Sequence, residues 1–340
     1  MRKLGLGLIG LGLIGRSHLR NCLSLNTAEL VAVADVSKKA LAFARNMGVR
    51  TQYEKYEELL KDTRVDAVII ALPTFLHRTC AQRAAEAGKD ILIEKPLARN
   101  LPEAKEIISS AEKNGVKLAV AYPYKFNGKF IEIKRSLVNG ELGDIQVAYA
   151  THLGSGPFQH RGSYVPRPVP QWWFNKEFTG GGALMDNGIH MINLLRWYFG
   201  EVEEINSILG YRFNLDFEDQ ALCITRFNGG PSVIFNIGWF SQQAHIKVDL
   251  FGTVKHASAI ITGLNILKSG IQMLTMNISD YWIMYMREVE DFVRCIRNDS
   301  TPSSSGYDGL KDLEVISRAY ANNILFSEFM NRLDTPNPKT

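Results

Sequence analysis

Short apolar runs alternate with amphipathic stretches from residue 4 to residue 121. Each apolar run is typical of a buried strand, and the stretches between them have helical spacing. The pattern predicts strands at 4–9, 29–34, 65–72, 90–93 and 117–121, and helices at 14–24, 37–47, 56–61, 77–87 and 102–114. Alternation of this kind requires a parallel sheet with crossover helices. We therefore expect an α/β, doubly wound fold in the first third of the chain.

The pattern changes after Tyr122. It predicts helices at 126–139, 183–199, 283–297 and 309–326, and strands at 145–149, 204–212, 221–227, 232–239 and 247–251. Residues 154–179 are rich in Gly, Pro, Arg and aromatic residues and show little periodicity. Loops of that length in a compact domain are usually functional. The second part is therefore expected to be α+β, with a large, open, mainly antiparallel sheet.

Length, charge and cysteine content narrow the class of protein. A chain of 340 residues is too long for one ordinary core and suits two domains. The net charge of +4 is small and spread along the chain, which argues against nucleic-acid and membrane partners. No apolar run is long enough to span a bilayer, and Arg16, His18 and Arg20 follow the first apolar run where a secretory signal would need a cleavage site. The 4 cysteines lie far apart without a C-x-x-C pair, which favours reduced thiols and a cytoplasmic protein.

A glycine motif joins the first strand to the first helix. Gly10, Gly12 and Gly15 have the spacing Gly-x-Gly-x-x-Gly, which combines a tight turn, close approach of the backbone to a pyrophosphate and close helix–strand packing. Leu13 and Ile14 open the helix, whose N-terminal N–H groups favour phosphate. The motif predicts a dinucleotide-binding Rossmann domain over 1–122, followed by a substrate-binding and oligomerisation domain over 123–340.

Asp35, at the end of the second strand, indicates which dinucleotide binds. It lies about twenty residues past the last glycine, where a carboxylate can accept hydrogen bonds from the adenosine ribose. Its charge repels a 2′-phosphate and favours NAD. Lys38 and Lys39 could still reach such a phosphate, so NADP remains the less favoured alternative.

Two further strands place candidate cofactor contacts at their carboxyl ends, which face the cofactor in a doubly wound sheet. Leu72, Pro73 and Thr74 end the strand at 65–72. The strand at 90–93 leads into Glu94-Lys95-Pro96, where the bond before Pro96 could be cis. We expect these segments to line the nicotinamide end of the cofactor.

The sequence resembles the Gfo/Idh/MocA family, the glucose-fructose oxidoreductase and inositol dehydrogenase group, over nearly the whole chain. The resemblance rests on the glycine motif at 10–15, on Glu94-Lys95-Pro96 and on the segment GGGALMDNGIH at 180–190. It implies NAD(P)-linked oxidation of a secondary alcohol on a sugar, sugar derivative or cyclitol. It also implies that the sheet of the second domain is used for oligomerisation, as a homodimer or homotetramer.

Oxidation of a secondary alcohol needs a base for the hydroxyl proton and a positive charge near the developing alkoxide. Asp186 and His190 are one helical turn apart and share a face, so His190 can exchange the proton and Asp186 can orient it. The Lys95 ammonium can polarise the reacting oxygen. In the alternative interpretations, His190 is a core histidine, Asp186 a helix-terminus residue and Lys95 a solvated turn residue. A metal site is disfavoured because a third ligand at suitable spacing is lacking.

The resemblance and the aromatic content suggest further contacts. Lys125 stands where the family commonly carries arginine and is a candidate substrate ligand, although it could be a surface charge. Trp172 and Trp173 could offer a flat face to a sugar ring or pack between domains. Pro73, Thr74 and His77 match the family's segment along the nicotinamide ribose, although His77 could instead cap local backbone. Asn193 replaces a residue that is often acidic in the family, and His160, Arg161 and Tyr164 of the long loop are candidates for shaping specificity.

Three functions are compatible with these residues. The first is an NAD-dependent sugar or polyol dehydrogenase, or the same enzyme working as a ketosugar reductase. The second is a redox-neutral glycosidase that retains NAD, which release of an aglycone without net NADH formation would identify. The third is a non-catalytic NAD sensor. The presence of Lys95, Asp186 and His190 together argues against a sensor, because binding alone needs no proton-transfer groups.

Overall fold

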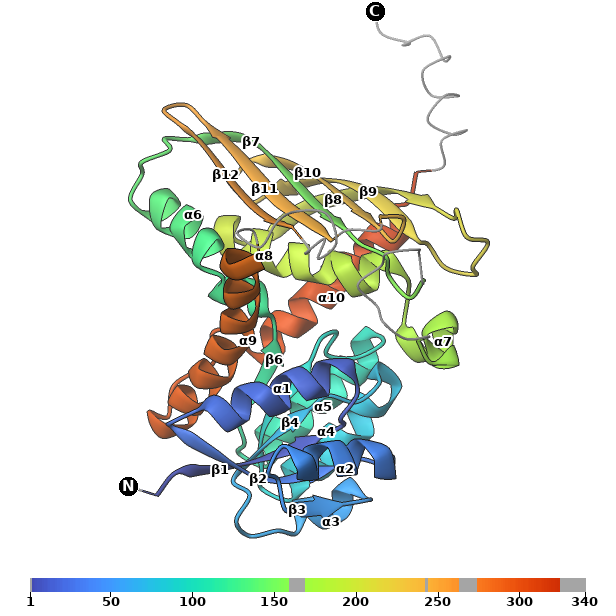
Figure 1. Ribbon diagram of the computed structural model, residues 1–340. Helices are drawn as coiled ribbons and strands as arrows, with labels where there is room; N and C mark the ends of the chain where they lie inside the picture. Colours follow the sequence, from blue (N-terminus) through green and yellow to red (C-terminus); the bar gives the residue numbers. More distant parts are fainter. Residues whose placement is uncertain (1, 159–168, 242–243, 263–273, 325–340) are drawn as a thin grey trace, which may run out of the picture. The chain divides into compact units, whose positions relative to one another are not determined.

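A computed structural model describes residues 2–158, 169–241, 244–262 and 274–324 of the chain (Figure 1). The described residues form two compact units. The first unit lies within 1–130, 177–180 and 270–313, and the second within 131–176, 181–269 and 314–340. The first unit therefore includes a stretch from late in the chain. A division into domains at residue 122 stays a prediction.

The first unit contains a six-stranded parallel sheet in the order β3-β2-β1-β4-β5-β6. Its strands are β1 (Leu4–Ile9), β2 (Ala28–Ala34), β3 (Thr51–Tyr53), β4 (Ala67–Ile70), β5 (Asp90–Glu94) and β6 (Leu118–Ala121). Its helices are α1 (Leu13–Ser24), α2 (Lys38–Asn46), α3 (Tyr56–Leu60), α4 (His77–Glu86), α5 (Leu101–Lys113) and α9 (Leu274–Arg297), with short 3₁₀ turns η1 (Thr74–Leu76) and η2 (Pro123–Phe126). The strand order reverses between β1 and β4, which is the switch point of a dinucleotide-binding sheet. The predicted Rossmann fold is confirmed.

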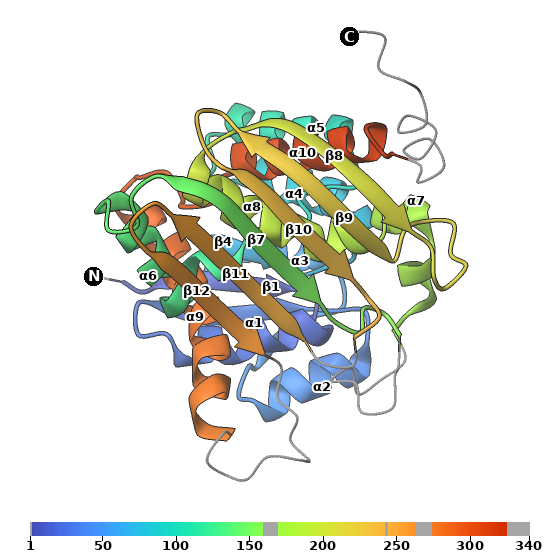
Figure 2. The same cartoon turned by 90° about the horizontal axis from the view of Figure 1, so that it is seen from above.

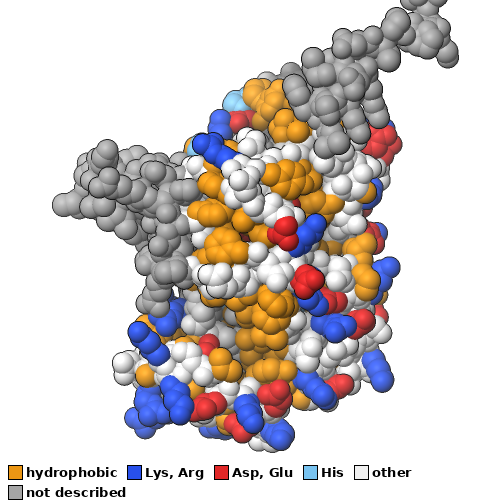
Figure 3. Space-filling model, turned by 90° about the vertical axis from the view of Figure 1, so that its right-hand side faces the viewer, with side chains coloured by type: hydrophobic (Ala, Val, Ile, Leu, Met, Phe, Trp, Pro, Cys, Tyr) orange, Lys and Arg blue, Asp and Glu red, His pale blue; other side chains and the backbone are white. Residues whose placement is uncertain are grey.

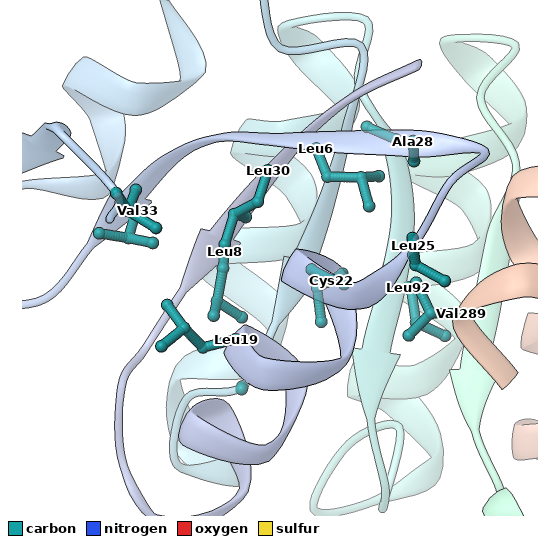
Figure 4. Close-up of a cluster of buried hydrophobic side chains, with 14 of the residues drawn as sticks. Leu6, Leu8, Leu19, Cys22, Leu25, Ala28, Leu30, Val33, Leu92 and Val289 are labelled. Atoms are coloured by element: carbon teal, nitrogen blue, oxygen red, sulfur yellow. The ribbon is translucent and has the colours of Figure 1, made fainter. Parts of the chain in front are cut away.

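Helices α1 and α9 help to build the core of this unit. Leu19 and Cys22 of α1 lie buried against Leu8 of the sheet, and Val289 of α9 joins the same cluster (Figure 4). Phe292 of α9 is also part of it. Because α9 supplies core side chains, the parallel sheet is completed by residues that are distant in sequence.

The boundaries differ from the sequence prediction where strands are short or helices are tied to neighbours. Strand β3 was not predicted, because its three half-buried residues are too few to show a period. Helix α9 begins at Leu274, earlier than the predicted 283. The last helix, α10 (Gly306–Ala321), ends before the predicted 326, because Asn323 and Ile324 pair with Ser207 instead.

The second unit contains a six-stranded sheet in the order β12-β11-β7-β10-β9-β8. Its strands are β7 (Ile145–Leu153), β8 (Val202–Gly210), β9 (Gln220–Phe227), β10 (Ser232–Gly238), β11 (His245–Gly252) and β12 (His256–Thr262). Only the β7–β10 pair is parallel among these described strands, so the sheet is mixed and mostly antiparallel, as predicted. Strand β12 is absent from the sequence prediction. The predicted end of β7 at residue 149 is too early, since the alternation of the chain continues to Leu153.

One face of this sheet is covered and the other is open. Ala148, Ala150 and His152 of β7 point to the buried face, against which helix α8 (Ile189–Phe199) lies. Within the part of the chain that the structure describes, no helix lies over the opposite face, which Figure 2 shows. The remaining elements are α6 (Gly128–Val138), the 3₁₀ turn η3 (Gln171–Phe174), α7 (Lys176–Thr179) and the π-helical turn η4 (Leu184–Gly188).

Surface and cysteine chemistry agree with the composition. Lys and Arg side chains are interspersed with Asp and Glu on the face drawn in Figure 3. Cys22, Cys80, Cys223 and Cys295 are all buried and free. None of the helices in the described ranges is both long and apolar enough to cross a membrane.

Candidate active site

The glycine motif forms a tight loop at the carboxyl end of β1. Gly10 has a φ of +94°, a conformation that residues with a side chain rarely adopt. A Cβ on Gly15 would overlap the carbonyl oxygen of Gly10, so α1 can begin close to the strand only because Gly15 has none. A Cβ on Gly12 would meet no atom within 4 Å. The loop therefore leaves open space at the glycine whose backbone is expected to approach a pyrophosphate.

Asp35 is fixed beside this loop by backbone N–H groups. One carboxylate oxygen, Oδ2, accepts a hydrogen bond of 2.6 Å from the Leu11 nitrogen, and Oδ1 accepts one of 2.7 Å from the Ser37 nitrogen. The side chain of the next residue, Val36, is 89% exposed, and Leu13 is also exposed. Asp35 thus lies at the sheet edge where the adenosine ribose was predicted.

The end of β4 comes next to the loop and is tied to the end of β5. The Leu72 side chain lies close to Gly10. His77 bridges the two strand ends: its Nε2 lies 2.9 Å from the Leu72 carbonyl oxygen and its Nδ1 lies 3.0 Å from the Pro96 carbonyl oxygen. Burial lowers the pKa of His77, and hydrogen bonds to these carbonyls oppose that effect. A neutral imidazole donates through one ring nitrogen only, so His77 can hydrogen-bond one of these two carbonyls at a time. Its predicted contact with the cofactor stays a prediction.

Lys95 follows β5 directly, and its peptide bond to Pro96 is cis. The side chain is partly exposed, whereas the preceding Glu94 is buried. Glu94 accepts a hydrogen bond from the Lys95 nitrogen and pairs with His18 of α1. Glu94 is a predicted cofactor residue, and its pairing with His18 has no local sequence signal, since the two residues are 76 positions apart.

Glu288 of α9 lies fully buried near this pair. Among the described residues, the one group that donates toward its carboxyl is the backbone N–H of Tyr122, which lowers its pKa slightly. Burial raises the pKa of Glu288 well above its usual value, and the nearby charges of Glu94 and Asp291 raise it further. Burial and the neighbouring acidic groups therefore favour the protonated form of Glu288.

In the second unit, Asp186 and His190 lie on one continuous helical segment. The predicted α-helix at 183–199 is wrong in its first turn, since Leu184–Gly188 forms a π-helical turn before α8 begins. Asp186 lies in that turn and is partly exposed, and His190 lies in the first turn of α8 and is buried. Single π turns within helices occur often at functional sites.

A carboxylate from a distant loop organises this turn. Glu218 accepts hydrogen bonds from the backbone nitrogens of Gly182 and Leu184 and from the Tyr320 hydroxyl, at 2.9–3.1 Å for the Oε1 oxygen. A Cβ on Gly182 would overlap the Glu218 backbone oxygen, which explains a glycine there. Burial raises the pKa of Glu218, while the N–H donors lower it. This cap could not be predicted from the sequence, because the spacing between Glu218 and the glycines matches no known capping pattern.

His152, at the end of β7, lies next to His190. Their ring centroids are 6.0 Å apart, and His152 Nδ1 lies 3.2 Å from the Asn187 carbonyl oxygen. If the ring is neutral, that donation leaves Nε2 as an acceptor. The alternation Ala148, Ala150, His152 could have placed this histidine on the covered face of the sheet, but the predicted strand ended before it.

The remaining candidates are placed as follows. The Lys125 ammonium is buried and donates to the Ser303 carbonyl oxygen at 3.3 Å, which ties η2 to the loop before α10. Trp172 and Trp173 are half-buried, with ring centroids 5.3 Å apart, and Asn193 is buried in α8. His160, Arg161 and Tyr164 lie outside the described residues. Substrate contacts of all these residues stay predictions.

The structure brings the predicted cofactor residues together at one edge of the parallel sheet, and it brings Asp186 and His190 onto one segment of the second unit. Lys95 belongs to the first unit, so its meeting with Asp186 and His190 stays a prediction. Among the described residues, no group of three or more His, Cys, Asp or Glu side chains could hold a metal ion.

Comparison with known proteins identifies the family. Residues 4–122 match the model of an oxidoreductase family with an NAD-binding Rossmann fold, and residues 130–257 match the GFO/IDH/MocA C-terminal domain. The chain belongs to the GFO/IDH/MocA oxidoreductases. The open space at Gly12 and the anchored Asp35 fit the dinucleotide that this family binds.

Several members of the family are similar over most of the chain. The scyllo-inositol 2-dehydrogenase (NAD(+)) of Bacillus subtilis is 29% identical over 326 residues, which is 90% of each chain. The myo-inositol 2-dehydrogenase of Thermotoga maritima is 28% identical over 89% of this chain and 91% of its own. Among solved structures, GenD2 from gentamicin A biosynthesis in complex with NAD has a TM-score of 0.83 at 22% identity and covers 95% of this chain and 94% of its own. The similarity to GenD2, at 22% identity, shows the fold alone.

The glycine loop generates the first testable prediction. Gly12→Val should weaken NADH binding by about ten-fold or more, because the branched side chain fills the space left for the pyrophosphate. The fold should be unaffected, since Gly12 has a φ of −65° and an added Cβ meets no atom within 4 Å. Fluorescence titration with NADH and a thermal melt of the unliganded protein would measure both effects. Gly128→Val, at another glycine with open space, is the control; equal NADH affinity in the two variants would contradict the assignment.

The buried acid generates the second prediction. Because its folded-state pKa is raised, Glu288 binds a proton in the native state that it releases on unfolding above its ordinary value of 4.5. Stability is therefore lost as pH rises, by about 1.4 kcal/mol per pH unit while the native proton is held. Glu288→Gln should remove this dependence, so its stability relative to the wild type should increase between pH 5 and pH 8.

Urea unfolding at several pH values would measure the difference. Glu290→Gln, on the same helix and partly exposed, is the matched control. A stability difference for Glu288→Gln that stays constant with pH would mean that Glu288 is ionised in the folded protein.

Proposed function

We propose that the protein is an NAD-dependent dehydrogenase acting on a secondary alcohol of a sugar, a sugar derivative or a cyclitol, or on the matching ketone in reverse. The proposal rests above all on Lys95, which follows β5 at the same sheet edge as the glycine loop and Asp35. A cation at that edge can stabilise the alkoxide that forms during oxidation, which nucleotide binding alone does not require. The names of the relatives agree, since they include inositol, levoglucosan and D-apiose dehydrogenases.

Each group has a role that the chemistry requires. Bound NAD supplies the acceptor for the hydride that leaves the alcohol carbon. His190 accepts the hydroxyl proton, and the Lys95 ammonium stabilises the negative charge that develops on the oxygen. Asp186 orients the imidazole or binds a neighbouring hydroxyl. We add His152 as a substrate ligand, since its ring lies beside His190 and its Nδ1 faces a backbone carbonyl.

NAD is the cofactor of this family, and the chain's own residues favour it over NADP. The Asp35 carboxylate is held by two backbone N–H groups, so its negative charge stays where a 2′-phosphate would have to lie. We propose that Val36 and Leu13, both exposed and apolar, contact the adenosine.

The other two functions receive less support. Six relatives with a named activity are dehydrogenases or a reductase, which does not favour a redox-neutral glycosidase. A non-catalytic sensor would have no need for Lys95, Asp186 and His190. No observation on the described residues specifically favours the glycosidase or the sensor.

The third prediction tests the reaction. NAD⁺ reduction should be screened across cyclitols, aldoses, uronates and anhydrosugars, and one class should give turnover. Lys95→Ala should lower kcat by about 10²- to 10³-fold and His190→Ala by about 10²- to 10⁴-fold, with NADH affinity nearly unchanged. Lys105→Ala, at an exposed lysine of α5, is the control. Unchanged turnover in Lys95→Ala would refute its role, and NADH binding without turnover on any compound would favour the sensor.

We also propose that the protein is cytoplasmic and self-associates through the open face of its mixed sheet. Tyr149, Ile234 and Ile224 form a row across β7, β10 and β9, since Tyr149 pairs with Ile234 and Ile234 with Ile224. Tyr149 and Ile224 are exposed, as is Phe251, whose ring contacts Tyr149 edge to face. A contiguous exposed apolar patch on a sheet is typical of an interface, and a two-fold axis would bring the patch against itself.

The fourth prediction concerns this patch. Ile224→Lys should convert a homodimer or homotetramer into a smaller species, because it places an unpaired charge in the apolar row. Light scattering coupled to gel filtration would measure the mass. Val254→Lys, at an exposed residue in the turn between β11 and β12, should leave the mass unchanged. A wild-type protein that is already monomeric would refute the proposal.

A further inference from the structure

Behind Lys95, a buried contact between a histidine and a glutamate connects the cofactor helix to the strand that carries the lysine. His18 Nε2 of α1 lies 2.7 Å from Glu94 Oε1 of β5. The His18 side chain is 0% exposed and that of Glu94 is 10% exposed. His18 lies on α1 just after the glycine motif, so its position is set by the same helix start that is expected to receive the phosphates.

The second oxygen of Glu94 acts on the chain at Lys95 itself. Glu94 Oε2 accepts a hydrogen bond of 3.2 Å from the Lys95 backbone nitrogen. One carboxylate therefore joins the His18 ring to the first peptide of the Lys95-Pro96 turn. On the other side of the turn, His77 holds the Pro96 carbonyl, so the backbone is fixed both before and after Lys95.

Acidic groups and an aromatic ring surround the contact between His18 and Glu94. From α9, Glu288 and Asp291 add acidic groups, and the ring of Tyr285 meets His18 edge-on at 6.3 Å. His18 is the side-chain donor that faces the Glu94 carboxylate. A buried carboxylate that loses its partner is strongly destabilised, and it would relax by moving or by taking up a proton. Either change alters the hydrogen bond between the Lys95 backbone nitrogen and Glu94 Oε2.

We propose that His18 and Glu94 are positioning residues for Lys95, and that they couple the placement of its ammonium to the start of the cofactor helix. The inference rests on the proposed role of Lys95 in the reaction. A buried ion pair contributes little net stability compared with apolar side chains of similar size, so the effect should be found in geometry at the lysine. A misplacement of about 1 Å can cost about 10²-fold in rate.

The fifth prediction uses two substitutions at one position. His18→Leu removes the donor to Glu94, and His18→Gln keeps an N–H near the place of Nε2. His18→Leu should lower kcat by about ten-fold to a hundred-fold with the KM for NAD⁺ changed by less than about two-fold, and His18→Gln should recover most of the loss. Cys22→Ala, at a buried residue of α1 outside the pair, controls for general destabilisation of the helix.

A second measurement needs no turnover. The rate at which an amine-reactive reagent modifies Lys95, followed by mass spectrometry, should change at least about three-fold in His18→Leu, because the turn is no longer held through Oε2, and should return toward the wild-type rate in His18→Gln. Glu94→Gln is the second route if His18→Leu does not fold. It keeps an acceptor for His18 and replaces the charge, and it should lower kcat less than His18→Leu.

The outcomes separate this inference from the proposed function. If Lys95→Ala abolishes turnover while His18→Leu and Glu94→Gln leave kcat and Lys95 labelling unchanged, the pair is only structural and the inference fails. If labelling of Lys95 responds to His18→Leu but Lys95→Ala keeps full turnover, the positioning holds and the proposed role of Lys95 fails. A loss in His18→Leu that equals the loss in Cys22→Ala, without rescue by His18→Gln, also overturns the inference.

Discussion

The close approach of α1 to the strand ends is the constraint on which the first unit depends. Gly15 lies against the Gly10 carbonyl, and Gly10 itself lies against Ala71 at the end of β4, so only hydrogen atoms fit at these positions. This contact leaves the N-terminal N–H groups of α1 free beside Gly12, where a phosphate can accept them. It also sets the position from which the His18 ring contacts the Glu94 carboxyl group. The same packing therefore governs the nucleotide loop and the support beneath Lys95.

Three buried carboxyl groups differ in their local partners. Glu218 receives two backbone N–H groups and a tyrosine hydroxyl, which lower its pKa against the effect of burial. Glu94 receives a histidine and a backbone N–H. For Glu288, burial and the charges of Glu94 and Asp291 raise the pKa well above the ordinary value, against a smaller opposing effect of the Tyr122 backbone N–H. Similar side chains thus serve as a helix cap, an anchor and a buried acid with a raised pKa.

Features encoded by local period were predictable from the sequence, and features that depend on a distant partner were not. The parallel strands, the glycine loop and the anchored Asp35 follow from short apolar runs and fixed spacings. The π turn at Asp186 depends on Glu218, which approaches from another part of the chain. The pairing of His18 with Glu94 joins residues 76 positions apart, and the three-residue strand β3 is too short to show a period. Strand β12 has the alternation typical of an edge strand. It is absent from the prediction because the hairpin turn before it is not recognised in the sequence.

The place of α9 has a consequence for how the chain acquires its structure during synthesis. Val289, Phe292 and Val293 fill the core between α1 and the parallel sheet, although they follow the entire mixed sheet in sequence. A nascent chain that ends at β6 lacks these side chains. The core of the nucleotide-binding unit is therefore complete only after α9 has been synthesised, and non-local contacts of this kind slow folding.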